Sequence, residues 1–368
     1  METTRDSVLG FRLRRHHLTR RLGSGAIPEV AAVAGLRNSP PGTAAEALLA
    51  RLTRLPADPF ESLVEVLGPR LVGTYVPIED VAVFTVGAMP ADERALREML
   101  GDRTAKALAA DGIGLAEAVR RISDAAREEL AGGPRTRGAL SAALTRRLPD
   151  SMSGWCERCG ATHVSDTLFR TPGGSGVLRV APRTGREVVL AALDLPDTDP
   201  EAARLELTRR FLRAYGPATP EDFAGWTNTG PTEARRRWAV LADELTDVTV
   251  GGRTAQLLRA DASALARATR PGGVRLLPAG DPHLLARDRA TLVPDAAGRK
   301  RLWPALAAPG AVLVDGELVA TWRARRRKDV LELDLTPFGP PPSPAAVEPG
   351  ARLLATHRGC ADVAVRVG

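Results

Sequence analysis

The sequence is poor in cysteine, in aromatic residues and in long apolar runs, and each shortage excludes a class of protein. Its 368 residues include only 3 cysteines, too few for a disulfide framework. No apolar run approaches the roughly 18 residues that a membrane-spanning helix needs. The charged start, METTRDSVLGFRLRRHHLTRR, also has no apolar signal segment. Since 44% of the residues are hydrophobic, we expect a globular cytoplasmic protein without membrane contact.

Lysine is almost absent, so arginine supplies nearly all the positive charge. Lys106, Lys300 and Lys328 are the only lysines, although Lys and Arg together number 51 against 44 Asp and Glu. The resulting net charge of +7 favours a polyanionic partner. Guanidinium forks suit phosphates and base edges better than ammonium groups do. An arginine-rich and alanine-rich composition is also what a GC-rich genome produces, and composition alone does not separate the two explanations.

The clearest predicted domain covers residues 196–268 and has the element order of a winged helix-turn-helix. Asp199-Pro200 starts one helix, Thr219-Pro220 starts a second, and TEARRRWAVLADEL forms a third. The glycine pair Gly251-Gly252 then predicts a β-hairpin, the wing. The third helix is the predicted recognition helix. The predicted DNA contacts are its solvent-facing arginines and one on the wing: Arg235, Arg236, Arg237 and Arg253.

Residues 1–90 are predicted to form a first winged helix with the same order of elements. A basic helix over residues 5–22 opens it, and two shorter helices flank the turn at 36–42. The arginines of the first helix are expected to lie outside the core. Three of them join the predicted DNA contacts: Arg12, Arg14 and Arg15.

The remaining chain is predicted to form a second winged-helix-like region over 91–195 and a β-rich domain over 269–368. Asp315-Gly316 between apolar runs is a strong hairpin signal. The basic run at 323–328 is placed between two strands, where it either clamps phosphates or forms a solvated edge that resists aggregation. Its predicted DNA contacts are Arg323, Arg325 and Arg326.

Several stretches in this order carry a family resemblance: VLGFRLRRHHL, GLRNSPPGTAAEALLARL, VPIEDVAVFTVGAMP, FLRAYGPATPEDFAGWT, EARRRW, LLPAGDPHLLARDRA, WPAL with AVLVDGELVATWRARRR, and RGCADVAV. They resemble the winged-helix DNA-binding family that includes the AlkZ-like DNA glycosylases of actinobacteria. The resemblance implies an α+β fold with tandem winged helix-turn-helix domains and a C-terminal β-rich domain around a basic DNA channel. It also implies hydrolysis of the N-glycosidic bond of alkylated or bulky-adduct purines, sometimes as self-resistance, with no metal or organic cofactor.

The resemblance places the catalytic element in the turn before the third helix of the first winged helix. The family's element there is similar to Gln-Φ-Gln (Φ apolar), and the matching positions are Arg37, Asn38 and Ser39, so both glutamines are replaced. A family variant with glutamine, a polar pair and Pro-Pro-Gly fits residues 38–42 better, but its leading glutamine is Arg37 here. A second departure lies at residues 71–77, where relatives carry a longer segment with an arginine and a histidine.

The chemistry of base removal suggests different roles for these three side chains. Cleavage builds positive oxocarbenium character on the sugar, and a water must be held on the face opposite the base. Asn38 and Ser39 have acceptors for such a water, whereas Arg37 would repel the sugar but can support the departing base or a phosphate. We hypothesise that Asn38 holds the attacking water. The alternative is a capped turn in which Ser39 precedes Pro40 at a helix start.

Two further motifs allow both a functional and a structural interpretation. Cys156 and Cys159 with His163 form half of a zinc site, with Asp166 as the nearest fourth ligand. Thiols packed beside the neighbouring tryptophan are the alternative, so we expect no metal. Asp281-Pro282-His283 either positions the last domain on DNA or is a turn capped by its aspartate.

We expect a monomer that binds double-stranded DNA in association with the nucleoid and inherits glycosylase activity on an alkylated purine. The first alternative is a catalytically degenerate relative that shields adducted DNA or regulates transcription. The second is a scaffold whose winged helices bind proteins, since fold does not fix function.

Overall fold

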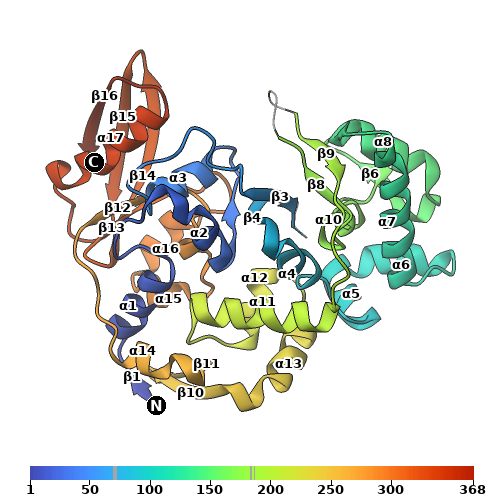
Figure 1. Cartoon of the computed structure of the whole chain (residues 1–368), viewed down its shortest axis with the longest axis horizontal. Helices are drawn as coiled ribbons and strands as arrows, with labels where there is room; N and C mark the ends of the chain where they lie inside the picture. Colours follow the sequence, from blue (N-terminus) through green and yellow to red (C-terminus); the bar gives the residue numbers. More distant parts are fainter. Residues whose placement is uncertain (69–72, 183–184, 186) are drawn as a thin grey trace. The chain divides into compact units, whose positions relative to one another are not determined.

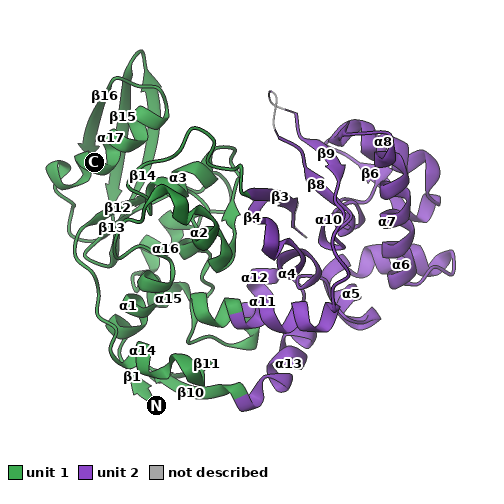
Figure 2. Ribbon diagram, viewed as in Figure 1, with its two compact units in different colours: residues 1–62, 210–222, 244–368 green, residues 63–209, 223–243 purple. Residues whose placement is uncertain are grey.

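The structure is a computed structural model in which residues 1–68, 73–182, 185 and 187–368 are described (Figure 1). It divides into two compact units, coloured separately in Figure 2. Unit 1 consists of residues 1–62, 210–222 and 244–368, and unit 2 of residues 63–209 and 223–243. None of the described helices is long and apolar enough to cross a membrane. Both units mix helices with sheets, so the predicted α+β class is confirmed.

The N-terminal part of unit 1 contains three helices and a short strand: α1 (Arg5–Arg15), α2 (Ile27–Ala34), β2 (Leu36–Arg37) and α3 (Thr43–Leu49). The Thr4 hydroxyl caps α1 by accepting the N–H of Ser7. The helix ends at Arg15, earlier than the predicted 5–22, because His17 takes a left-handed φ of 54° and turns the chain. Val8 and Phe11 of α1 are buried against Leu257 and Leu265 in a small core.

The predicted wing is a β-hairpin of unit 1. β10 (Leu245–Val250) pairs antiparallel with β11 (Arg253–Leu258), with Val250 opposite Arg253 across the Gly251-Gly252 turn. β1 (Glu2–Thr3) adds to β10 in parallel. The prediction of a hairpin that turns at Gly251-Gly252 is therefore confirmed.

The C-terminal part of unit 1 is a five-stranded sheet in the order β12 (Val274–Leu277), β13 (Gly310–Val314), β14 (Glu317–Arg327), β15 (Val330–Pro337), β16 (Asp362–Val367). α17 (Pro344–His357) connects the parallel strands β15 and β16. Its Val347 and Ala351 join Trp322 and Leu333 in the core. Short helical segments precede β13: α14 (Ala262–Ala266), η6 (Pro282–Leu285), α15 (Arg289–Leu292) and α16 (Ala296–Leu302).

The basic run at 323–328 is not a connection between strands, and that prediction is wrong. Arg323 to Arg327 form the second half of β14. Trp322 is buried and Ala324 half-buried, while Arg323, Arg325 and Arg327 are exposed, as strand alternation requires. Glu332 of β15 lies opposite Arg325 and also pairs with Arg327 and Arg366. The run is therefore part of a sheet strand, with Arg323, Arg325 and Arg327 on one face and Arg326 on the other, and carboxylates neutralise part of its charge.

Unit 2 combines a mainly helical core with a sheet. Its helices up to residue 174 are α4 (Val81–Val86), α5 (Glu93–Leu100), α6 (Asp102–Ala110), α7 (Leu115–Ala131), α8 (Arg137–Arg147), α9 (Asp166–Phe169) and α10 (Thr171–Gly174). Its sheet has the order β4 (Gly73–Pro77), β3 (Leu63–Leu67), β8 (Leu178–Val180), β9 (Val189–Ala192), β5 (Arg135–Thr136). Ile122 and Ala126 of α7 and Leu140 and Leu144 of α8 lie in one core, each almost fully buried.

The three predicted helices before the wing are present as α11 (Pro200–Tyr215), α12 (Pro220–Thr227) and α13 (Pro231–Val240). Their order before the β10–β11 hairpin is that of a winged helix. α13 belongs to unit 2 and the hairpin to unit 1. The division into domains at 1–90, 91–195, 196–268 and 269–368, and the channel between them, stay predictions.

Candidate functional site

The turn that matches the family's catalytic element joins β2 to α3 in unit 1. The Asn38 side chain is 7% exposed, and its Oδ1 accepts the N–H of Gly42 at 2.8 Å. The Thr43 hydroxyl closes the same turn by donating to the carbonyl of Pro40 at 2.7 Å. Ser39 is exposed and caps no helix, since α3 begins at Thr43 after Gly42. The capping residue of this turn is thus Asn38, not Ser39 as the structural alternative had it.

A segment from the far end of the chain packs against this turn. A Cβ added at Gly280 would lie 3.2 Å from Cδ of Arg37 and 3.6 Å from the carbonyl oxygen of Ser39. Gly280 also has a left-handed φ of 74°, which glycine adopts without strain. Glycine therefore allows the 280 turn to approach the candidate catalytic turn closely.

Directly after Gly280 begins a buried ionic network. Arg51 and Asp281 form two hydrogen bonds of 2.7 and 2.8 Å, and both residues are 1% exposed. Arg51 also donates to the carbonyls of His16 and Ala47, each at 2.8 Å. Asp281 accepts the N–H of His283 at 2.9 Å, as the capped-turn interpretation predicted. The sequence analysis missed the partner Arg51, because nothing in its neighbourhood marks it as different from the other arginines.

Two histidines next to this network are buried in the neutral form. Burial lowers the pKa of His283 to about 3, and burial also holds the pKa of His16 well below its usual value. The two rings lie 5.3 Å apart, and the ring of Tyr215 lies 5.1 Å from His16. The Tyr215 hydroxyl donates to the carbonyl of Pro282 at 2.8 Å. These side chains hold the 280–285 segment in place.

The neutral histidines predict that the free energy of unfolding falls in mild acid. Both folded pKa values lie below the unfolded value of about 6.5, so the unfolded chain takes up protons first as the pH drops. We expect His283 to contribute a loss of about 2 kcal/mol between pH 7.5 and 5 by urea unfolding, and His16 to add a loss in the same direction. The His283→Asn variant should lose its own part of this pH dependence. An unchanged dependence in that variant would contradict the assignment.

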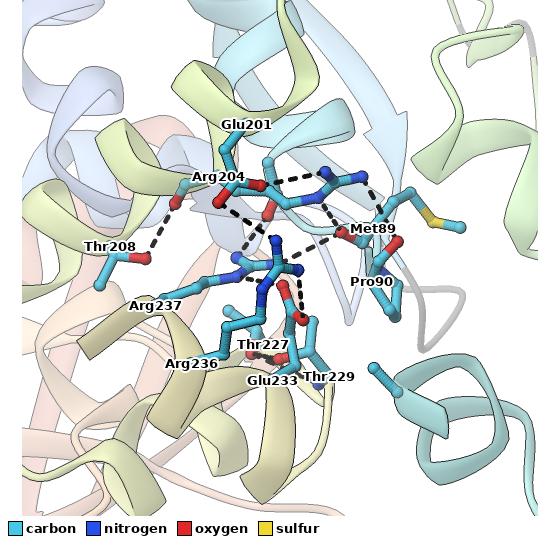
Figure 3. A network of polar contacts seen from close by, with 12 residues as sticks. Met89, Pro90, Glu201, Arg204, Thr208, Thr227, Thr229, Glu233, Arg236 and Arg237 are labelled. Atoms are coloured by element: carbon cyan, nitrogen blue, oxygen red, sulfur yellow. Dashed lines mark hydrogen bonds and ion pairs between the residues drawn. The ribbon is translucent and has the colours of Figure 1, made fainter. Parts of the chain in front are cut away.

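Two of the predicted DNA contacts are buried, and the prediction that they face solvent is wrong. Arg12 is 1% exposed and holds Asp288 and the carbonyls of Gly216 and Pro217. Arg237 is 1% exposed and binds Glu233 at 2.7 Å and two carbonyls, those of Gly87 and Met89 (Figure 3). Burial lowers the pKa of Arg237.

The position of Arg237 could have been anticipated. It follows the core residue Ala234 by three positions and therefore shares its side of α13. An arginine can be buried on this side of α13 because its long stem is apolar and its N–H groups can all donate to carbonyls and a carboxylate.

The other predicted contacts are accessible to different degrees. Arg15 is half-buried, paired with Asp261 and stacked on Phe11. Arg236 is exposed and lies 3.7 Å from carboxylates of Glu201 and Glu233 (Figure 3). The other predicted DNA contacts are all exposed: Arg14, Arg235, Arg253, Arg323, Arg325 and Arg326. Their contact with DNA stays a prediction.

A basic pocket in unit 1 is lined by several cationic side chains, most of which were not among the predicted DNA contacts. Its lining comprises Arg253, Arg287, Asp288, Arg289, Ala290, Thr291, Arg299, Lys300 and Trp303. The guanidinium of Arg289 stacks on the Trp303 ring at 5.0 Å. The Trp303 indole N–H donates to the carbonyl of Leu284 at 3.1 Å, which ties the pocket to the 280–285 segment. Cationic side chains bind the phosphates of a nucleic acid, and an aromatic ring beside them can stack on a base.

Part of the second family departure falls outside the described residues, which resume at Gly73 after 68. Residues 73–77 form β4.

Three comparisons with known proteins agree. The family model described as "DNA glycosylase AlkZ-like" matches residues 29–357. The chain is 34% identical to the interstrand DNA cross-link repair glycosylase of Streptomyces sahachiroi over 149 residues, which span 38% of each protein. The solved structure of the DNA glycosylase AlkZ from the same organism covers 100% of both chains with a TM-score of 0.77 at 21% identity. That structural likeness shows a shared fold.

Proposed function

Because the chain belongs to the AlkZ-like DNA glycosylase family, we propose that it binds duplex DNA and removes an alkylated or bulky-adduct purine by hydrolysis. The observation that carries the proposal is the family match over residues 29–357, which includes both the 36–42 turn and the basic pocket. The cross-link repair activity named for the Streptomyces sahachiroi relative supports a bulky lesion as substrate.

The reaction breaks the bond between C1′ of the deoxyribose and the base nitrogen, and the oxygen of a water bonds to C1′ while that water gives up a proton to the solvent. An alkylated purine that carries positive charge leaves as a neutral base, so the protein mainly has to orient the water and stabilise the sugar cation. The products are a free modified base and an abasic site.

The geometry of the turn supports a different role for each of its three polar residues. The Asn38 oxygen already accepts the Gly42 N–H, so we assign Asn38 to holding the shape of the turn. Ser39 is exposed, and its hydroxyl is the group we assign to the water. Arg37, beside Gly280, is assigned to a phosphate next to the lesion. Arg37, Asn38 and Ser39 thus stay the proposed site, with the water moved from Asn38 to Ser39.

The proposal is tested by single-turnover incubation with a duplex that contains one alkylated purine. Release of the free modified base, with an abasic site left in the strand, is the expected result, and an undamaged duplex is the control. Tight binding of the adducted duplex without base release would identify a non-catalytic relative instead.

The basic pocket is expected to contribute to DNA affinity through phosphates. Lys300→Ala and Arg287→Ala remove exposed cations of its lining. Each variant should weaken binding to any duplex and reduce the slope of log affinity against log salt by about 0.9. Arg352→Ala is the matched control, because this exposed arginine lies on α17 and is held by Glu348 at 2.6 Å. Equal slopes in all three variants would exclude the pocket from the interface.

A further inference from the structure

A second cluster of chemically reactive side chains lies on a short hairpin of unit 2. β6 (Ser153–Cys156), labelled beside α8 in Figure 1, pairs antiparallel with β7 (Ala161–Val164). The ligand atoms of Cys156, Cys159 and His163 all lie within 4.8 Å of one another. In the part of the chain that the structure describes, this is the one such group that combines thiols with an imidazole.

The turn of the hairpin brings the two thiols together. The Cys156 carbonyl accepts the N–H of Cys159 at 3.1 Å and that of Gly160 at 2.9 Å. Gly160 has a φ of 60°, the left-handed conformation that a glycine adopts without strain. The backbone therefore folds back after Cys159, and both sulfur atoms reach the same point.

The histidine arrives from the second strand. Gly154 lies opposite His163 and Cys156 opposite Ala161, so Cys156 and His163 are diagonal neighbours on the hairpin. The Nδ1 of His163 lies 2.8 Å from the carbonyl of Val164, which makes Nδ1 the protonated nitrogen. Nε2 is then left with its lone pair, and a hydrogen bond of this kind typically orients a metal-binding histidine.

The alternative of thiols packed beside Trp155 does not match the exposure of these side chains. Trp155 is 62% exposed and Cys159 is exposed as well. Alternation along β6 places the side chains of Trp155 and Cys156 on opposite faces. Packing against Trp155 therefore does not explain why two thiols and an imidazole converge.

We propose that Cys156, Cys159 and His163 bind one Zn²⁺ ion through two thiolates and one imidazole. Two sulfurs and one nitrogen are a ligand set that Zn²⁺ prefers, and an oxygen donor completes the tetrahedron. Asp166 lines the same groove as Cys159 and His163, but its carboxylate is not in the cluster and lies 3.6 Å from Arg137, so a water fills the fourth position. The expectation of no metal, drawn from the sequence, is replaced by this proposal.

The role of the ion is structural. Each strand of the hairpin has only four residues, and an isolated two-stranded hairpin of this length is marginally stable. The base of the hairpin is held to α8 by the Val164 N–H, which donates to the Thr145 hydroxyl at 3.0 Å. The metal holds the opposite end, so that binding energy becomes local folding energy.

The test uses the full-length chain reconstituted with a slight excess of zinc and then freed of unbound metal. We expect about one zinc per chain by elemental analysis. Cobalt in place of zinc should give thiolate-to-cobalt charge-transfer absorption and the strong visible bands of a tetrahedral site. Less than about half a zinc per chain, or a cobalt spectrum without thiolate bands, would overturn the proposal without recourse to any variant.

Substitutions then assign the ligands. Cys156→Ser, Cys159→Ser and His163→Ala should each lose most of the metal. Cys360→Ser, which changes the buried cysteine of unit 1, is the matched control and should keep it. Equal metal content in Cys156→Ser and Cys360→Ser would overturn the assignment.

Hydrogen exchange tests the structural role. Removal of zinc should speed amide exchange in residues 153–164 and leave the β13–β15 strands of unit 1 unchanged. Exchange that is unaltered in the hairpin of a chain shown to lose its metal would overturn this role.

Discussion

Replacement of Arg51 by methionine is expected to destabilise the protein by about 3–5 kcal/mol. The substitution leaves the carboxylate of Asp281, 1% exposed, without the guanidinium that binds it and frees the carbonyls of His16 and Ala47. A buried charge that loses its partner keeps the full cost of its desolvation. Urea unfolding of the two proteins at neutral pH measures the difference.

The double variant Arg51→Met/Asp281→Leu is the control for this effect. It removes both charges and fills the space with apolar atoms, so it should be markedly more stable than Arg51→Met alone. If the single substitution costs less than about 1 kcal/mol, the pair is not the buried ionic contact that holds the 280 turn.

Loss of the Ser39 hydroxyl is expected to slow release of the modified base by about 100-fold in single turnover. Ser39 is the exposed polar residue between the buried Asn38 and the Pro40 carbonyl that closes the turn. A water without its acceptor samples many orientations, and the attack on C1′ becomes correspondingly rare. The comparison of wild type with Ser39→Ala on one adducted duplex measures the loss.

Ser39→Thr keeps the hydroxyl and is expected to retain most of the rate, which makes it the matched control. DNA affinity should be similar in all three proteins, because the substitution removes no charge. A Ser39→Ala protein as fast as wild type would remove the residue from the proposed mechanism.

The departures from the family's glutamine-containing element lie in a turn whose framework is intact. Asn38 closes it, Gly280 packs against it, and Arg51 joins α3 to the segment that follows Gly280. The substitutions therefore change the side chains that would face the substrate, while the residues that hold the turn in place remain. For this reason we propose that the protein is active although the two glutamines are replaced.

Local signals in the sequence were sufficient for most elements. Gly251-Gly252 and Asp315-Gly316 each lie at the turn of an observed hairpin. Asp199-Pro200 stands at the start of α11. These turns and this helix start depend on neighbouring residues, so local sequence patterns are enough to find them.

The prediction of solvent-facing arginines failed where distant parts of the chain meet. Arg12 is held by Asp288, 276 positions away. Arg51, which was not among the predicted residues, is held by Asp281, 230 positions away. No local pattern contains such a partner. The carboxylates that neutralise β14 were missed for a related reason, because they lie across the sheet and not beside the arginines in sequence.

The sequence by itself determined the family, the α+β class, the hairpins and the position of the candidate catalytic turn, because these depend on motifs and short-range periodicity. Only the tertiary structure decided which arginines are buried, that Gly280 approaches the candidate catalytic turn, and that two thiols and an imidazole converge on one hairpin. A side chain's burial and charge environment are set by the groups that folding brings to it. Those groups come from anywhere in the chain.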